Sequence, residues 1–186
     1  MDRSDAPPVR RARVADARVI AQLLHDFNRE FDEPTPPLTE LEHRIARLLE
    51  GDDTVILLVG DNPDGLAVLR FRDAIWSGGR ECYLAELYVA PAQRGHGLGR
   101  ALMNAALQEA LDRGADTMEI AVDEPDVAAR RLYESVGFTN RTGGTDGPLI
   151  YLYERDLRSS QGGPCKWRCQ FGHRPSDLRN SAPNSN

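Results

Sequence analysis

The chain has 186 residues, of which 40% are hydrophobic and 28% charged, and its formal net charge is −6 at pH 7. This length and composition predict one soluble globular domain and argue against two. The negative charge argues against nucleic acid as the main partner, because no strong basic field would attract phosphate backbones, and it suits a cationic small substrate.

No apolar run in the chain reaches the roughly 18–20 residues that a membrane-spanning helix requires. Residues 1–13 contain no hydrophobic signal region. We therefore expect a cytoplasmic protein with no membrane partner.

The first half of the chain predicts a strand, two helices and three further strands, in that order. Apolar residues from Ile20 to Phe31 recur at helical spacing, and the prolines at 34, 36 and 37 must end that helix. Continuous or alternating apolar runs bounded by glycine-rich turns predict the strands. The predicted ranges are strand 9–14, helices 17–30 and 40–50, and strands 54–59, 66–71 and 82–89.

The segment from Glu86 to Met103 carries the strongest functional signal. A strand ends at Val89, Pro91 follows, and the glycine-rich turn 94–99 opens a helix that extends to about Arg113. Such a turn directs unpaired backbone N–H groups and the positive end of a helix dipole at one point, which makes it an anion site, most naturally for phosphate. The turn lacks the Lys-Ser/Thr pair of a P-loop, and its glycines lack the spacing of the dinucleotide-binding fingerprint.

The remainder of the chain predicts three more strands and one helix. We expect a strand at 117–122, a helix from the Asp126 cap to Gly137, a strand that begins at Phe138 and a last strand at 149–154. Residues 1–8 form an N-terminal extension, 9–157 the domain, and 158–186 a disordered tail without periodicity. The tail contains Cys165, Cys169 and His173, but no fourth ligand is evident, so we expect no metal; the role of the tail stays open.

Two motifs resemble those of the GNAT superfamily of N-acetyltransferases. The Arg-x-x-Gly-x-Gly turn at 94–99 is similar to the coenzyme A loop of that family, and Ala129–Phe138 resembles its A-x-x-L-Y-x-x-x-G-F segment. The element order over 9–157 is also that of the family. The resemblance implies the GNAT fold, an α/β (α+β) fold whose mixed, mostly antiparallel sheet of six to seven strands is flanked by about four helices.

The resemblance further implies that acetyl-coenzyme A is the co-substrate, without a metal, and that its acetyl group is transferred to an amine in a ternary complex. The pyrophosphate would rest on the glycine turn, and the pantetheine arm would pair with strand backbone where the family's strand bulges. Asp126 departs from the family, which often has Asn there, and this makes the charge near the phosphates less favourable. The cofactor-binding residues implied are Leu87, Tyr88, Val89, Arg94, Gly95, His96, Gly97, Leu98, Gly99, Arg100 and Asp126.

The chemistry needs a base, because an alkyl amine with a pKa of about 10.4 is neutral in only about one molecule in 2,500 at pH 7. Glu86 is the candidate, directly or through water, since a carboxylate in an apolar strand is costly to bury without a role. Alternation places Glu86 with Leu84 and Tyr88 on one face unless a bulge intervenes. By its place in the second motif, Tyr133 is the candidate general acid for the departing thiolate. A structural carboxylate and a buried structural tyrosine are the alternatives.

The acceptor side is the least readable part of the sequence. Related proteins shape it with loops that here contain Glu30, Asp32 and Glu33, and Trp76 is a further candidate. Clustered carboxylates would attract a cationic amine, although a solvated acidic loop has the same composition. We expect a small amine substrate. A protein or peptide N-acetyltransferase and a non-catalytic acyl-coenzyme A sensor remain the alternatives, and a homodimer is left open.

Overall fold

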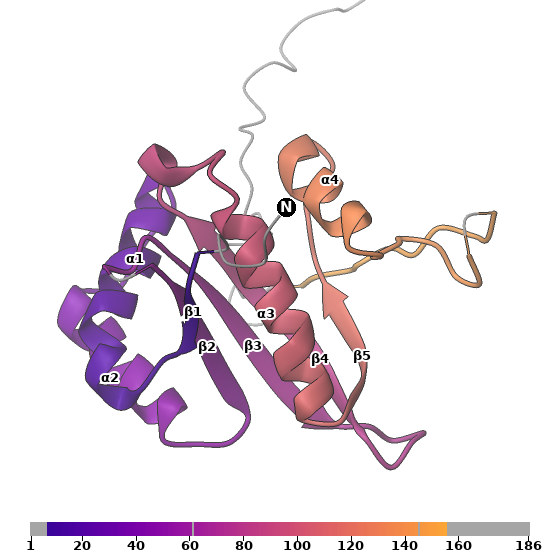
Figure 1. Ribbon diagram of the computed structural model, residues 1–186, viewed down its shortest axis with the longest axis horizontal. Helices are drawn as coiled ribbons and strands as arrows, with labels where there is room; N and C mark the ends of the chain where they lie inside the picture. Colours follow the sequence, from indigo (N-terminus) through magenta and orange to yellow (C-terminus); the bar gives the residue numbers. More distant parts are fainter. Residues whose placement is uncertain (1–6, 61, 145, 156–186) are drawn as a thin grey trace, which may run out of the picture.

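A five-stranded mixed sheet organises this computed structural model, which describes residues 7–60, 62–144 and 146–155 (Figure 1). The strands lie in chain order; neighbouring strands among the first four run antiparallel to each other, whereas the fifth is parallel to the fourth. They are β1 (Val9–Arg11), β2 (Thr54–Val59), β3 (Gly65–Asp73), β4 (Arg80–Val89) and β5 (Ala115–Ile120).

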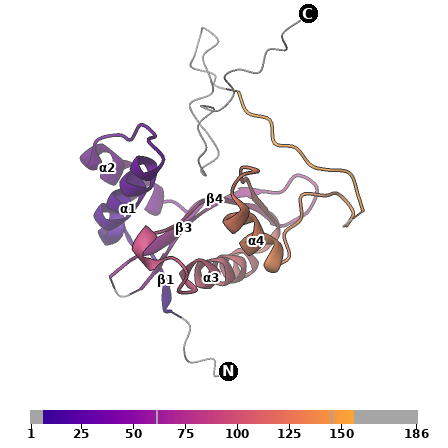
Figure 2. The ribbon, with the colours of Figure 1, turned by 90° about the horizontal axis from the view of Figure 1, so that it is seen from above.

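Helices cover both faces of the sheet (Figure 2). α1 (Ala17–Glu30) and α2 (Leu38–Leu49) pack on one face, and α3 (Leu98–Asp112) and α4 (Val127–Ser135) lie on the other. Short 3-10 turns at Val14–Asp16 and Pro91–Gln93 complete the elements. The mostly antiparallel sheet and four α-helices of the described residues confirm the predicted fold class.

The continuous apolar run of β2 follows from its central position. All six of its residues are buried, because neighbouring strands flank it and helices cover both of its sides. Alternate side chains therefore enter different cores: Ile56 and Leu58 pack with α1, whereas Leu57 packs with Leu102 of α3. The sheet is thus held from two sides by separate apolar cores.

A bulge in strand β4 changes which of its side chains point to each face of the sheet. Glu86 pairs with Val68 of β3, but Leu84 pairs with the next β3 residue, so Ala85 has no partner opposite. Leu84 consequently belongs to the α3-side core, while Tyr88 belongs to the α1-side core. The alternation predicted for a strand without a bulge therefore holds for Glu86 and Tyr88, which share the α1 side, whereas the extra residue moves Leu84 to the opposite face.

Strand β5 pairs with only the first half of β4. The parallel ladder joins Arg80–Leu84 to Ala115–Ile120 and then stops, because β5 ends at Ile120. From Glu86 to Val89, the only strand partner of β4 among the described residues is β3. Among the described residues, the two parallel strands therefore leave a backbone edge without a strand partner at the carboxyl end of β4.

The predicted number of strands was too high, since the described residues contain five. Phe138 packs beside Tyr133, with ring centroids 6.2 Å apart, and does not begin a strand. Residues 149–154 form one isolated bridge, Leu149 with Arg141, and Ile150 N donates to Asn140 O at 2.8 Å. Pro148 has no N–H to extend that ladder, which explains its shortness. The first predicted strand is also shorter, because Val14 already lies in a 3-10 turn.

Several predictions fall on parts of the chain that the structure does not describe. Residues 1–6 and 156–186 lie outside the described ranges, and with them nearly all of the predicted extension, the predicted tail, and Cys165, Cys169 and His173. Among the described residues, no helix has the length and apolar character needed to cross a membrane. Within the same ranges, no group of three or more His, Cys, Asp or Glu side chains is placed to hold a metal ion.

Candidate active site

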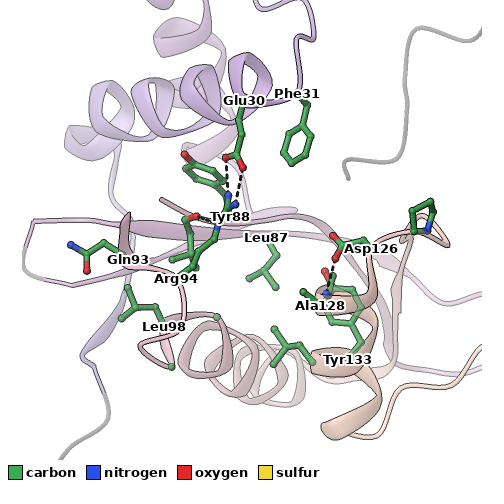
Figure 3. Close-up of a pocket in the computed structure, with 17 residues that line it drawn as sticks. Glu30, Phe31, Leu87, Tyr88, Gln93, Arg94, Leu98, Asp126, Ala128 and Tyr133 are labelled. Carbon is green, nitrogen blue, oxygen red and sulfur yellow. Dashed lines mark hydrogen bonds and ion pairs between the residues drawn. The ribbon is translucent and has the colours of Figure 1, made fainter. Parts of the chain in front are cut away.

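A cavity of about 480 Å³ opens at the free end of β4 (Figure 3). Four segments form its wall: the end of α1, the last residues of β4, the glycine turn with the start of α3, and the start of α4. Because these segments come from both sides of the sheet, the cavity extends around the unpaired edge of β4. The lining residues are Glu30, Phe31, Leu87, Tyr88, Val89, Gln93, Arg94, Gly95, Gly97, Leu98, Gly99, Pro125, Asp126, Ala128, Ala129, Leu132 and Tyr133.

The glycine turn has the backbone that an anion site requires. Gly95 and Gly97 have φ angles of +81° and +82°, values that residues with a Cβ rarely adopt. Gly97 is the N-cap of α3, and no side chain caps that helix end. The first N–H groups of α3 thus remain available beside the cavity, with open space around both glycines. This arrangement fits a phosphate group of a cofactor.

Arg94 is the only cation among the described residues that line the cavity. Its Nη1 and Nη2 atoms donate to the two carboxylate oxygens of Glu30, each at 2.7 Å, and its Nε donates to Val89 O at 2.9 Å. Two other predicted phosphate contacts lie outside the lining. Arg100 donates to Ser135 Oγ at 3.0 Å, and the ring of exposed His96 lies 3.2 Å from Gln93 O.

The end of β4 presents side chains to both cores beside the cavity. Leu87 and Val89 pack against the α3-side core, whereas Tyr88 stacks on Phe27 of α1 with ring centroids 4.9 Å apart. Burial raises the pKa of the Tyr88 hydroxyl. All three residues line the cavity, as a pantetheine arm bound along this edge would require. The Val89 carbonyl is already an acceptor for Arg94.

Tyr133 reaches the cavity from α4 and is only 3% exposed. Burial, reinforced by the nearby carboxylate of Asp126, raises its pKa, so the hydroxyl stays protonated and can donate a hydrogen bond. Asp126 also caps α4, as predicted: its Oδ1 accepts from Ala129 N at 2.8 Å. The cap fixes the start of α4, and with it the approach of Tyr133 to the cavity.

Glu86 does not line the cavity but lies two residues before Tyr88 on the strand. Its partner Val68 belongs to the α1-side core, so the carboxyl group faces that side of the sheet. Burial raises the pKa of Glu86 from 4.5 to about 8, against the opposing effect of Arg70. Its Oε2 atom is buried without a hydrogen-bond partner among the described residues. A buried carboxyl oxygen normally has a hydrogen-bond partner, so Oε2 is a candidate acceptor for a ligand or a water molecule.

Of the four predicted acceptor residues, only Glu30 lines the cavity. Asp32 and Glu33 follow it in the chain without contributing to the lining. Trp76 is 94% exposed in the turn between β3 and β4, beside the amino end of β4 and therefore at the opposite end from the cavity. We remove Trp76 from the candidate site.

Sequence reasoning missed several lining residues. Phe31 has the spacing of the buried stripe of α1, yet it lines the cavity as well as packing against the core. Ala129 and Leu132 belong to the tyrosine motif, so that motif was a signal for them. No signal in the sequence singled out Pro125 or Gln93.

Comparison with known proteins finds similarity to acetyltransferases over most of the chain. The model of the acetyltransferase (GNAT) family matches residues 20–138. The uncharacterized N-acetyltransferase YhfO of Bacillus subtilis (strain 168) is 30% identical over 137 residues, which are 73% of this chain and 91% of that protein. A crystal structure of a candidate acetyltransferase from Arthrobacter sp. FB24 shares 47% identity with a TM-score of 0.75, covering 83% of this chain and 99% of the other.

A shorter match joins the chain to the mycothiol acetyltransferase of Thermobispora bispora. The two are 50% identical over 62 residues, which are 32% of this chain but only 21% of the relative. The matched segment therefore spans about a fifth of the length of that relative.

Proposed function

The chain belongs to the acetyltransferase (GNAT) family, and from this premise we propose that it transfers the acetyl group of acetyl-coenzyme A to a small cationic amine. In this proposal the amine attacks directly within a ternary complex, without a covalent intermediate on the protein. A cytoplasmic location stays a prediction from the sequence, and the oligomeric state stays open.

The observation that carries the proposal is the cavity around the free edge of β4. It joins, in one space, the glycine turn, the unpaired end of a strand and the buried hydroxyl of Tyr133. A phosphate-bearing cofactor with an extended arm needs these three features in that order: anion donors, a backbone edge, and a hydrogen-bond donor at the reacting end. The two sequence motifs supply the glycine turn and Tyr133. The unpaired strand end arises because β5 stops at Ile120.

Each segment has a role when the cofactor is bound. The backbone N–H groups of 95–99, at the start of α3, would hold the diphosphate, and Leu87–Val89 would hold the pantetheine arm. Acetyl-coenzyme A supplies an activated acetyl thioester when it is bound. Tyr133 would donate a hydrogen bond or a proton to the leaving sulfur.

Glu86 is the proposed base. Its pKa of about 8 is close to the working pH, which is the range in which a general base is most effective. Glu86 lies beside Tyr88 on the α1 side of β4, so it would receive the amine proton from that side, directly or through water. The Glu30 carboxylate on the same side supports a cationic acceptor, and the net charge of −6 agrees with it.

A thiol-release assay over a panel of amines tests this function. Purified protein and acetyl-coenzyme A are mixed with polyamines, aminoglycosides, lysine analogues and short peptides, and free coenzyme A is measured. We expect turnover with at least one small cationic amine and little with peptides. Turnover with peptides alone would favour a protein N-acetyltransferase, and tight cofactor binding without turnover on any amine would favour an acyl-coenzyme A sensor.

A further inference from the structure

Glu30 and Arg94 join two segments that are 64 residues apart in the chain. Glu30 is the last residue of α1, and Arg94 opens the glycine turn. Both carboxylate oxygens of Glu30 accept from Arg94, at 2.7 Å each, in the two-pronged geometry that arginine also adopts with phosphate (Figure 3). The pair thus binds the end of the first helix to the proposed phosphate site.

Arg94 is held in place by contacts other than Glu30. Its Nε atom donates to Val89 O at 2.9 Å, and its guanidinium carbon lies 6.0 Å from the centre of the Tyr88 ring. Tyr88 is itself stacked on Phe27. Because these contacts use the Nε atom and the face of the guanidinium, Nη1 and Nη2 can exchange partners without moving the side chain.

The same two nitrogens are the donors that a diphosphate would use. Arg94 is the only cation among the described residues of the cavity wall, whereas Glu30 and Asp126 both contribute negative charge. An anionic cofactor therefore meets a wall whose one positive group is already neutralised. Glu30 and a diphosphate cannot both bind the same two donors of Arg94 in a bidentate manner.

We propose that Glu30 takes the place of the cofactor diphosphate on Arg94 and becomes a binding group for the acceptor amine when the diphosphate displaces it. This inference rests on the proposed function. The released carboxylate lies at the end of α1, on the side of the sheet that Tyr88 and Glu86 face. A cationic amine held there would lie on the same face of the sheet as the proposed base.

The exchange couples the binding of the cofactor to the binding of the amine. Before the cofactor binds, Glu30 is engaged with Arg94 and the amine lacks its carboxylate partner. After the cofactor binds, the carboxylate is available, so each ligand strengthens the binding of the other by the same factor. One ion pair thereby couples the two substrates of the enzyme.

The test is the binding of coenzyme A itself to the wild-type chain and to Glu30→Gln by isothermal titration calorimetry. Glutamine keeps the shape of the side chain but removes the charge that competes for Arg94. A partly exposed ion pair of this kind contributes about 0.2–1 kcal/mol, so we expect coenzyme A to bind about 1.4- to fivefold more tightly to the variant. In steady-state kinetics with the best amine of the panel, KM for the amine should rise more than kcat falls.

Two further variants make the result specific. Glu40→Gln removes the acid of another surface pair, with Arg44 on α2, and should leave the affinity for coenzyme A unchanged. In an Arg94→Gln background, Glu30→Gln should no longer tighten binding, because the shared partner is gone. Equal or weaker binding of coenzyme A to Glu30→Gln alone would overturn the inference and leave Glu30 as a group that only positions Arg94. Absence of coenzyme A binding by the wild-type chain would instead contradict the proposed function.

Discussion

The two ends of strand β4 have different surroundings, although ten consecutive residues form both. From Arg80 to Leu84 the strand is paired with β3 on one side and β5 on the other. From Glu86 to Val89 its one strand partner within the described part of the chain is β3, and these residues line the cavity or lie next to it. One bulged residue, Ala85, separates the two ends. The comparison teaches that the candidate site lies where the backbone of β4 no longer forms hydrogen bonds with β5.

The largest effect should come from Glu86→Gln at the unpaired end. If Glu86 is the general base, its loss should lower kcat by about 10²–10⁴-fold, the usual contribution of such a group. Steady-state turnover with the best amine measures this. The matched control is Glu81→Gln at the paired end of the same strand, where the carboxylate pairs with Arg72 away from the cavity. Equal rates for the two variants would remove the functional difference between the ends.

Glu86→Gln should also change how the free energy of unfolding depends on pH. The pKa of Glu86 is raised from 4.5 to about 8, so the folded protein binds the proton more tightly than the unfolded chain does. The free energy of unfolding of the wild type should therefore fall as the pH rises from about 4.5 to 8, and level off above that. Glu86→Gln should lack this decline. Denaturant titrations at several pH values measure the difference, and parallel curves for the two proteins would contradict the buried carboxyl.

Leu84→Ala tests the paired end of the strand. Leu84 is 2% exposed in the α3-side core, so its truncation should lower the free energy of unfolding by about 2–5 kcal/mol. Urea denaturation measures this loss. The affinity of the folded protein for coenzyme A should change little. Leu87→Ala, on the other side of the bulge, should cause a smaller loss of stability, because Leu87 is only partly buried. It should weaken the binding of coenzyme A, because Leu87 lines the cavity.

Tyr133→Phe tests whether α4 completes the unpaired end of β4. A hydrogen bond to a charged group contributes about 1.5–3 kcal/mol, so losing the bond to the departing thiolate should lower kcat roughly 10- to 150-fold. The affinity for coenzyme A should stay close to that of the wild type. Tyr151→Phe, which alters an exposed tyrosine outside the cavity lining, is the control. An unchanged kcat for Tyr133→Phe would leave this side chain as a packing residue of the core.

Local features of the site could be predicted from the sequence, and long-range features could not. The glycine turn and the Asp126 cap are set by residues next to one another, and the structure has both. The bulge at Ala85 and the early end of β5 depend on how neighbouring strands pair, so alternation alone could not place Glu86. The Glu30–Arg94 pair joins residues 64 positions apart, and nothing in the local pattern of either segment indicates it.

The smallest effect should come from Leu152→Ala, in the segment where the sequence predicted a strand. Leu152 is 62% exposed, and Leu149–Tyr153 range from 43% to 89%, so their apolar side chains lack the cover that Leu84 has. An uncovered side chain contributes little to folding, and we expect a change of at most about 0.5 kcal/mol in the free energy of unfolding.

A loss of about 2 kcal/mol or more would mean that Leu152 is covered in solution, as a strand of the sheet would be. Repeating the denaturation over a hundredfold range of protein concentration identifies the cover. A loss that grows with concentration would assign it to a second copy of the chain, because association stabilises the folded state by mass action. A loss independent of concentration would assign it to residues of the same chain and would restore the longer predicted sheet.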